Sequence, residues 1–268
     1  VAAMFLGLTI ANIVGVPATT WLGQTFDWRL AFAVTAVLGV IAMIGLYKTL
    51  PIMAKPERPN IKKELKAITQ PAALRAFGTT VLCAGSMFTL YTYIAPIMST
   101  LADATDNQIA LMLTLIGIGF TLGNYLSGKV ADISADLALF VFLALQVAVS
   151  FLFSFTSTTL IGAFITSVLW GAVIFGTGPA LQMQVMHVAK DAPGLASSIN
   201  IGAFNLGNAV GAAYGGLVIT LGYGFVYIPA AAGVLSLLAL MMVYINRRCR
   251  EQAPTESSVE APSPQSCQ

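Results

Sequence analysis

The sequence predicts an all-α fold, a bundle of helices that crosses a lipid bilayer several times. Hydrophobic residues make up 57% of the 268 residues. Charged residues make up only 9%, against roughly 25% in an average soluble domain. The apolar residues form long continuous runs between short polar or turn-forming breaks. These runs lack the alternating polarity, over about 10 residues, of a membrane β-barrel strand.

This composition argues against a soluble enzyme, a nucleic-acid-binding protein and a disordered chain. The net charge is only +2, so the total charge gives no sign of a polyanionic partner. Three cysteines and one histidine are too few for a disulfide framework or an ordinary zinc site. No Ser, His and Asp set or pair of carboxylates suits catalysis. We therefore expect no enzyme activity, cofactor, metal or nucleic-acid partner.

Eight stretches are long enough to cross the bilayer, because a membrane helix needs about 20 mainly apolar residues. We expect spans at about residues 1–21, 30–50, 76–98, 108–127, 137–155, 160–182, 195–219 and 224–245. The chain opens at Val1 inside the first apolar run, and no signal-peptide pattern is visible. We therefore expect the chain to be a fragment that lacks its N-terminal part.

The orientation in the membrane is predicted by the basic residues, which favour the cytoplasmic side. Of the 13 Lys and Arg residues, only Arg29 lies in the set of loops that also carries Asp27, Asp103 and Asp106. All the others lie in the opposite set of loops and ends. We therefore expect both ends of the chain and the 51–75 connection to face the cytoplasm.

The same spacing of spans divides the chain into four parts. Residues 1–50 hold the first two spans, and residues 51–75 form a cytoplasmic linker. Residues 76–246 hold the other six spans. Residues 247–268 are rich in Pro, Ser and Glu, and we expect a disordered cytoplasmic tail there.

Part of the linker has the pattern of a short amphipathic helix. Ile61, Leu65 and Ile68 fall on one helical face, and basic residues lie around the other. This pattern fits a helix lying on an anionic membrane surface. It also fits a solvated helical linker that carries topology signals, which is the interpretation we favour.

The polar groups inside the spans are neutral, since no Asp, Glu, Lys or Arg lies near the middle of a span. An ionisable group there would be the default sign of a proton relay. A buried amide needs hydrogen-bond partners or water. We therefore expect Asn12, Asn205 and Asn208 to face the protein interior or a wet cavity. The residues alone leave cavity lining and hydrogen bonding between helices equally open.

Two spans carry small residues at intervals of four, which places them on one helical face and lets another helix approach closely. These residues are Gly7, Ala11 and Gly15 in the first span and Gly207, Gly211 and Gly215 in the seventh. Residues 11–15 (Ala-Asn-Ile-Val-Gly) and 207–211 (Gly-Asn-Ala-Val-Gly) form a weak repeat, six predicted spans apart. Transporters with two parallel six-span halves have this organisation.

Two prolines lie inside predicted spans, Pro17 in the first and Pro179 in the sixth. Proline removes a backbone donor and kinks a helix unless neighbouring groups compensate. A kink beside a cavity would serve gating, and a merely bent helix is the alternative.

At these residues the sequence resembles the major facilitator superfamily. Residues 7–17 resemble its fifth-helix motif of spaced glycines before a proline, and residues 128–132 (Gly-Lys-Val-Ala-Asp) resemble its loop motif between helices eight and nine. The runs 88–94 and 200–208 are similar to the bacterial arabinose-efflux-permease-like group of the drug:proton antiporter family. The resemblance implies a partial major facilitator fold, eight of twelve helices, with residues 1–50 as the last two helices of the N-terminal half.

The resemblance also implies a function. It predicts a secondary transporter of the bacterial inner membrane, a monomer that exports a small organic solute by alternating access. The solute would be a sugar, a nucleoside or a drug-like amphiphile, exchanged for protons through a carboxylate in the N-terminal half. The alternative is a membrane scaffold, or a degenerate transporter fragment, that moves no solute.

The resemblance assigns roles to individual residues. It implies that Asn12, Tyr91, Asn205 and Asn208 line the substrate cavity. The glycine-proline motif and the loop motif imply conformational roles for Gly15, Pro17, Gly128 and Asp132. For Asp132 the expected role is to hold the outward-closed state at a helix end, and the alternative is a loop residue that only sets topology.

Overall fold

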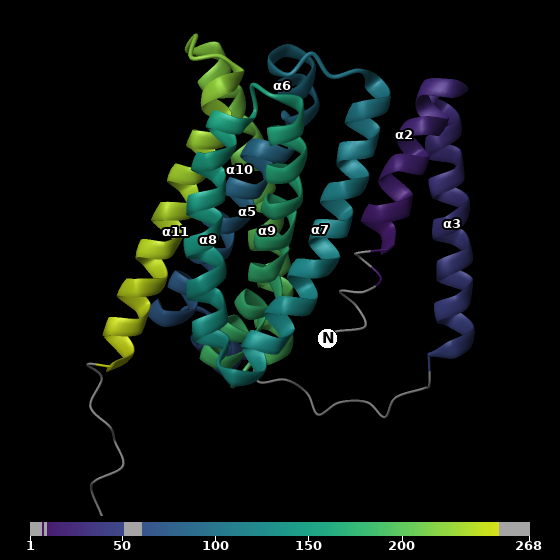
Figure 1. Ribbon diagram of the computed structural model, residues 1–268. Helices are drawn as coiled ribbons and strands as arrows, with labels where there is room; N and C mark the ends of the chain where they lie inside the picture. Colours follow the sequence, from purple (N-terminus) through teal and green to yellow (C-terminus); the bar gives the residue numbers. More distant parts are fainter. Residues whose placement is uncertain (1–6, 8–9, 51–60, 252–268) are drawn as a thin grey trace, which may run out of the picture.

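The computed structural model describes residues 7, 10–50 and 61–251, and these residues are helical almost throughout (Figure 1). No strand occurs in these ranges, so the predicted all-α class is confirmed. The expected disordered tail beyond residue 251, the start of the first span and part of the linker lie outside the described residues.

The helices follow one another with short connections. In chain order they are η1 (Ala11–Gly15), α2 (Val16–Thr25), α3 (Trp28–Thr49), α4 (Ile61–Ile68), α5 (Pro71–Tyr91), α6 (Ile94–Leu101), α7 (Asp106–Ile133), α8 (Ala135–Thr156), α9 (Leu160–Val188), α10 (Pro193–Thr220), η2 (Phe225–Tyr227) and α11 (Ile228–Glu251).

Six helical stretches of the described chain are long and apolar enough to cross a membrane. They are Trp28–Thr49, Pro71–Leu101, Asp106–Ala131, Ala135–Thr156, Leu160–Val188 and Phe225–Arg248. The predicted seventh span is α10, which has 28 residues but is not among the six. Its Gly, Ser and Asn residues make it less apolar than its neighbours. Of the predicted first span, the described part forms η1 and α2.

The third predicted span differs from its prediction. It begins at Pro71 rather than near residue 76, because a proline without an N–H is well placed in the first turn of a helix. It is also interrupted, since α5 ends at Tyr91 and α6 begins at Ile94. Pro96 has no N–H to bond the carbonyl of Thr92, so a regular helix cannot continue across this point.

The six helices α5 and α7–α11 pack into one bundle with a repeating contact pattern (Figure 1). If α5, α7 and α8 are one unit and α9, α10 and α11 the other, the first helix of each unit contacts the second and third helices of the other unit. The chain runs through α5 and α9 in opposite directions. This is the pattern of an inverted three-helix repeat, as found within the halves of two-domain transporters.

Glycines form the contact between α5 and α10. A Cβ on Gly207 would lie 2.5 Å from the carbonyl oxygen of Val81, and one on Gly211 would overlap the carbonyl oxygen of Gly85. The Thr89 hydroxyl donates to the Gly211 carbonyl at 3.0 Å. The predicted glycine face of the seventh span therefore lies directly against α5.

A second glycine contact joins α7 and α9. A Cβ on Gly123 would overlap the Ala172 carbonyl, and one on Gly119 would lie 2.5 Å from the Val168 carbonyl oxygen. This contact was not predicted, although Gly119 and Gly123 are also four residues apart.

The N-terminal helices lie at one side of this bundle. Residues of η1 and α2 contact α7, and α3 pairs with α2 (Figure 1). Among the described residues, no atom lies within 4 Å of a Cβ added at Gly7 or Gly15. The close helix approach expected at these two glycines is therefore not made by the part of the chain that the structure describes.

Both interpretations of the linker expected a helix, and α4 is that helix. Its Lys63 Nζ lies 3.3 Å from Asp191 Oδ1 in the turn between α9 and α10. Ala67 is buried and Ile68 packs against the cluster around Phe77, whereas Leu65 is 54% exposed. Only part of the predicted apolar face therefore packs against the bundle.

Candidate functional site

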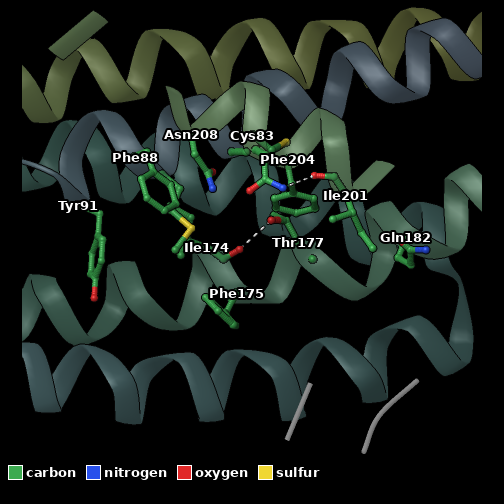
Figure 2. Close-up of a pocket in the computed structure, with 14 residues that line it drawn as sticks. Cys83, Phe88, Tyr91, Ile174, Phe175, Thr177, Gln182, Ile201, Phe204 and Asn208 are labelled. Carbon is green, nitrogen blue, oxygen red and sulfur yellow. Dashed lines mark hydrogen bonds between the residues drawn. The ribbon is translucent and has the colours of Figure 1, made fainter. Parts of the chain in front are cut away.

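A cavity of about 500 Å³ lies between α5, α9 and α10 (Figure 2). No side chain in its wall is charged. The wall consists of Cys83, Ala84, Met87, Phe88, Tyr91, Ile174, Phe175, Thr177, Gly178, Gln182, Ile201, Phe204, Asn205 and Asn208.

Helical spacing explains why these residues share a cavity. Residues three or four apart lie on one face of a helix. On α10 the wall residues 201, 204, 205 and 208 form such a face, next to the glycine face that contacts α5. On α5 the wall residues 84, 88 and 91 do the same. Close packing at the glycines therefore aims the neighbouring faces of both helices into the cavity.

The α9 part of the wall includes the segment before Pro179. The carbonyl of Gly176 accepts a hydrogen bond from the Ser127 hydroxyl of α7. The Thr177 hydroxyl donates to the Ile174 carbonyl at 2.7 Å (Figure 2). Neither bond reaches the carbonyl of Phe175, which is the group that Pro179 leaves without its usual N–H partner. The helix α9 nevertheless continues through the proline, and Thr177 and Gly178 border the cavity.

The aromatic side of the wall is supported from behind. Tyr91 stacks on the fully buried Trp170, with ring centroids 6.3 Å apart and an interplanar angle of 15°. Phe175 stacks on the buried Phe120 at 4.0 Å. Phe88 meets Tyr91 edge-on at 6.1 Å. These contacts hold the rings that border the cavity in fixed orientations.

A chain of neutral side chains closes one end of the cavity at Gln182. Gln182 donates to Ser197 at 2.7 Å and accepts from Asn200 at 2.7 Å. Asn200, which is fully buried, also accepts from the Thr80 hydroxyl at 2.7 Å. These hydrogen bonds join α5, α9 and α10, and they use both the nitrogen and the oxygen of the Gln182 amide.

The two asparagines of α10 differ in their surroundings. Asn205 donates to the carbonyl of Ile201 on its own helix, at 3.1 Å. The side-chain oxygen of Asn208 is buried and has no hydrogen-bond partner within the described ranges. In Figure 2 the Asn208 side chain points toward the cavity from α10. Asn208 therefore has unused hydrogen-bonding capacity, and so do the side-chain oxygen of Asn205 and the hydroxyl of Tyr91, which have no hydrogen-bond partner among the described residues.

Three of the four expected cavity residues come together here, namely Tyr91, Asn205 and Asn208. The fourth, Asn12, lies in η1, which contacts α7. The expected packing residue Ala11 begins the same element. Gly215 lies against the α5–α6 junction, where a Cβ would come 2.5 Å from the Tyr93 ring.

The expected conformational residues lie apart from the cavity. Gly15 ends the π-helical turn η1, and Pro17 follows in the first turn of α2. A wider π turn before a proline is a common way to accommodate its missing N–H. Gly128 and Asp132 lie near the end of α7, and a Cβ on Gly128 would meet no described atom within 4 Å. In this conformation Gly128 therefore does not provide the close helix approach expected of it.

Several wall residues were not predicted. Phe88, Phe175 and Phe204 are ordinary apolar residues of a span, and the sequence does not show which face of a span meets a cavity. Thr177 and Gln182 had a usable signal, because both are polar and lie close to Pro179.

Comparisons with known proteins agree with the resemblance to the major facilitator superfamily. The family model described as Major Facilitator Superfamily matches residues 1–200 and, in a second match, residues 82–266. The chain is 51% identical over 248 residues to the inner membrane transport protein YdhP of Escherichia coli strain K12, covering 92% of this chain and 64% of that protein. It is 28% identical over 243 residues to a probable sugar efflux transporter of Helicobacter pylori, covering 90% of this chain and 62% of that protein.

A solved structure gives the same fold. The crystal structure of the major facilitator transporter FucP, in the outward conformation, matches 86% of this chain and 55% of its own length, with a TM-score of 0.60 and 15% identity. The chain spans about two thirds of the length of its curated relatives, 64% in the case of YdhP.

Proposed function

The chain belongs to the major facilitator superfamily, and from this premise we propose that it is part of a secondary active transporter of the inner membrane that exports a small, uncharged organic solute by alternating access. The names of its relatives, an inner membrane transport protein and a sugar efflux transporter, support the membrane and the direction.

The observation that carries the proposal is the uncharged cavity between α5, α9 and α10. Its volume of about 500 Å³ falls in the range of small-molecule sites, which is about 300–1,000 Å³. Burying a charge without a partner costs far more than burying a neutral polar group. A wall of aromatic rings, aliphatic side chains and amides therefore favours a neutral solute over an anion or a cation.

Proton antiport is the coupling that we propose. No carboxylate belongs to the cavity wall among the described residues. The proton would therefore bind at a group outside this wall. In this proposal Asn12 joins Tyr91, Asn205 and Asn208 in contacting solute during part of the cycle. Gly15, Pro17, Gly128 and Asp132 act in the change of conformation.

The test is a transport assay with the complete transporter that contains this chain, purified and placed in liposomes, across a panel of labelled neutral sugars, nucleosides and amphiphiles. We expect flux of at least one solute that rises when a proton gradient is imposed. Ile201→Trp, which narrows the cavity, should abolish this flux. The matched control Leu217→Trp changes an exposed apolar residue of the same helix outside the wall and should leave the flux intact.

The scaffold alternative makes the opposite prediction. A protein that is folded in the liposomes but moves no solute of the panel, with or without a gradient, would contradict the transport proposal.

A further inference from the structure

The hydrogen-bonding capacity of the cavity wall is mostly used within the protein. Thr177 donates to the carbonyl of Ile174, and Asn205 donates to that of Ile201. Gln182 uses both ends of its amide on Ser197 and Asn200. Asn208 is the amide whose buried oxygen has no partner within the described ranges. The polar groups that remain for a solute are few, namely the Asn208 amide, the Asn205 oxygen and the Tyr91 hydroxyl.

The same wall offers large and rigid aromatic surfaces. Phe88, Tyr91, Phe175 and Phe204 border the cavity on its three helices (Figure 2). Tyr91 and Phe175 are each stacked on a buried ring, Trp170 and Phe120 respectively. Because these supporting rings are fully buried, stacking a solute on the wall would cost little further ordering of side chains.

A free sugar fits this wall poorly. It carries a hydroxyl group on almost every carbon, and each hydroxyl that leaves water without a new partner is penalised. A flat unsaturated ring has weakly hydrated faces and gains by stacking on other rings. One hydrogen-bonding edge on such a ring would suit the Asn208 amide.

We propose that the cavity selects a neutral solute that carries a flat, unsaturated ring, and that the ring lies against Phe88, Tyr91 and Phe175 while its polar edge meets Asn208. This inference rests on the proposed transport function and narrows its substrate class. Two sources would supply such a ring, a nucleobase in a neutral nucleoside or an aryl group on another neutral solute.

The test compares pairs of ligands that share a sugar and differ in the group attached to it. Equilibrium binding to the purified protein is measured for phenyl β-glucoside and cyclohexyl β-glucoside, which share the sugar and have apolar groups of similar size. Adenosine and ribose form the second pair, and this arm distinguishes a nucleobase from an aryl group. We expect the flat-ring member of at least one pair to bind about 10-fold more tightly than its partner, from stacking on two or more rings.

Two variants of the wall test where this preference arises. Phe88→Leu and Phe175→Leu keep an apolar side chain but remove a ring face. Each should reduce the preference for the flat ring about 3- to 10-fold. The control Phe155→Leu removes a ring that is 79% exposed on α8, outside the cavity wall, and should not change the preference. The ligand pairs on the unmodified protein decide the question even where a variant does not fold.

Each outcome supports or overturns the inference. Equal binding within both pairs, or a preference that survives both wall variants, would overturn it. Flux of a free sugar without binding of any flat-ring ligand would overturn it while leaving the proposed transport function intact. Absence of all binding and all flux would overturn the proposed function, and this inference with it.

Discussion

Asn205 and Asn208 lie about one turn apart on α10, and the sequence predicts the same position for both, facing the interior or a cavity. The structure separates them, because the Asn205 amide is bonded to its own helix and the Asn208 oxygen has no partner within the described ranges. The difference arises from neighbouring helices, which decide what surrounds each side chain. Asn208 therefore carries a sharper prediction than the other expected cavity residues.

Asn208→Ala should weaken binding of the transported solute about 10-fold, because a lost hydrogen bond in a cavity is worth about 1–1.5 kcal/mol. Binding to the purified protein measures this directly. Asn107→Ala, at an exposed asparagine of α7 outside the wall, is the matched control and should leave the affinity unchanged. An Asn208→Ala protein that binds as well as the original would remove this residue from the site.

Asn200 has a structural role, because its side chain forms hydrogen bonds with other residues rather than with solute. Asn200→Ala would remove two buried hydrogen bonds, the one from the Thr80 hydroxyl and the one to the Gln182 oxygen. Thr80 would keep only its longer bond to the Ala76 carbonyl, at 3.3 Å. We expect a loss of about 2–4 kcal/mol in the free energy of unfolding. Thermal or denaturant unfolding in detergent measures it. Ser198→Ala, at an exposed serine that bonds only the Gly194 carbonyl, should stay close to the original.

At the scale of elements, two glycine contacts hold the bundle together, one between α5 and α10 and one between α7 and α9. They occupy equivalent places in the inverted repeat, since each joins the first helix of one unit to the second helix of the other. The glycines of α10 were predicted from the sequence to make a close contact, and those of α7 were not. Spacing showed that a close contact was possible, and only packing showed which helix makes it.

The glycine contacts predict substitutions of opposite sign. Gly123→Ala and Gly211→Ala place a methyl group onto the backbone of the facing helix, and each should destabilise the protein by about 2–3 kcal/mol. Gly202→Ala meets nothing within 4 Å and should stabilise α10 by about 0.5–1 kcal/mol, because alanine loses less backbone freedom than glycine. Unfolding in detergent compares all three. Equal effects at the three sites would show that these contacts are not tight.

The junction between α5 and α6 shows where a pattern of apolar residues fails. Residues 76–98 are continuously apolar enough for one span, so the sequence predicted one helix. The backbone stops at Tyr91 and resumes at Ile94. The Tyr93 hydroxyl donates to the Ala212 carbonyl of α10 at 2.9 Å. Hydropathy measures the environment of a segment and not its hydrogen bonding, so it does not detect the break.

At the scale of the whole molecule, orientation is still a prediction. The C-terminal ends of α7 and α11, which carry Lys129 and Arg247, and the turn after α9, which carries Lys190, should face the cytoplasm. Single cysteines at positions 190 and 107, in a background without Cys83, Cys249 and Cys267, test this with a thiol reagent that does not cross membranes. In intact cells the reagent should label position 107 and spare position 190. The reverse labelling would invert the topology.

The last prediction concerns Asp132 and the change of conformation during the transport cycle. If Asp132 meets the N-terminus of another helix in one of two conformations, Asp132→Asn should slow turnover about 2- to 5-fold, the range expected for a carboxylate near a helix N-terminus. Solute affinity should change less than twofold. The control is Asp103→Asn, an exposed carboxylate near the opposite ends of the helices. Unchanged turnover would leave Asp132 as a residue that only sets topology.

The sequence by itself determined the class of the protein, the approximate position of most spans and the family. These properties follow from local composition, because a segment must be apolar over about 20 residues to lie in lipid, whatever its neighbours. They also include the glycine face of α10 and the polar residues that require a partner.

Only the tertiary structure decided which faces meet. It brought together in one cavity the residues Phe88, Phe175, Thr177, Tyr91, Asn205 and Asn208. It also gave the Gln182 amide hydrogen-bond partners at both ends, while the Asn208 oxygen has no partner in the described chain. In lipid an apolar residue gains little from facing another helix rather than the lipid acyl chains, since both surroundings are apolar. Composition therefore cannot distinguish these faces, and the close fit of one helix against the next decides among them.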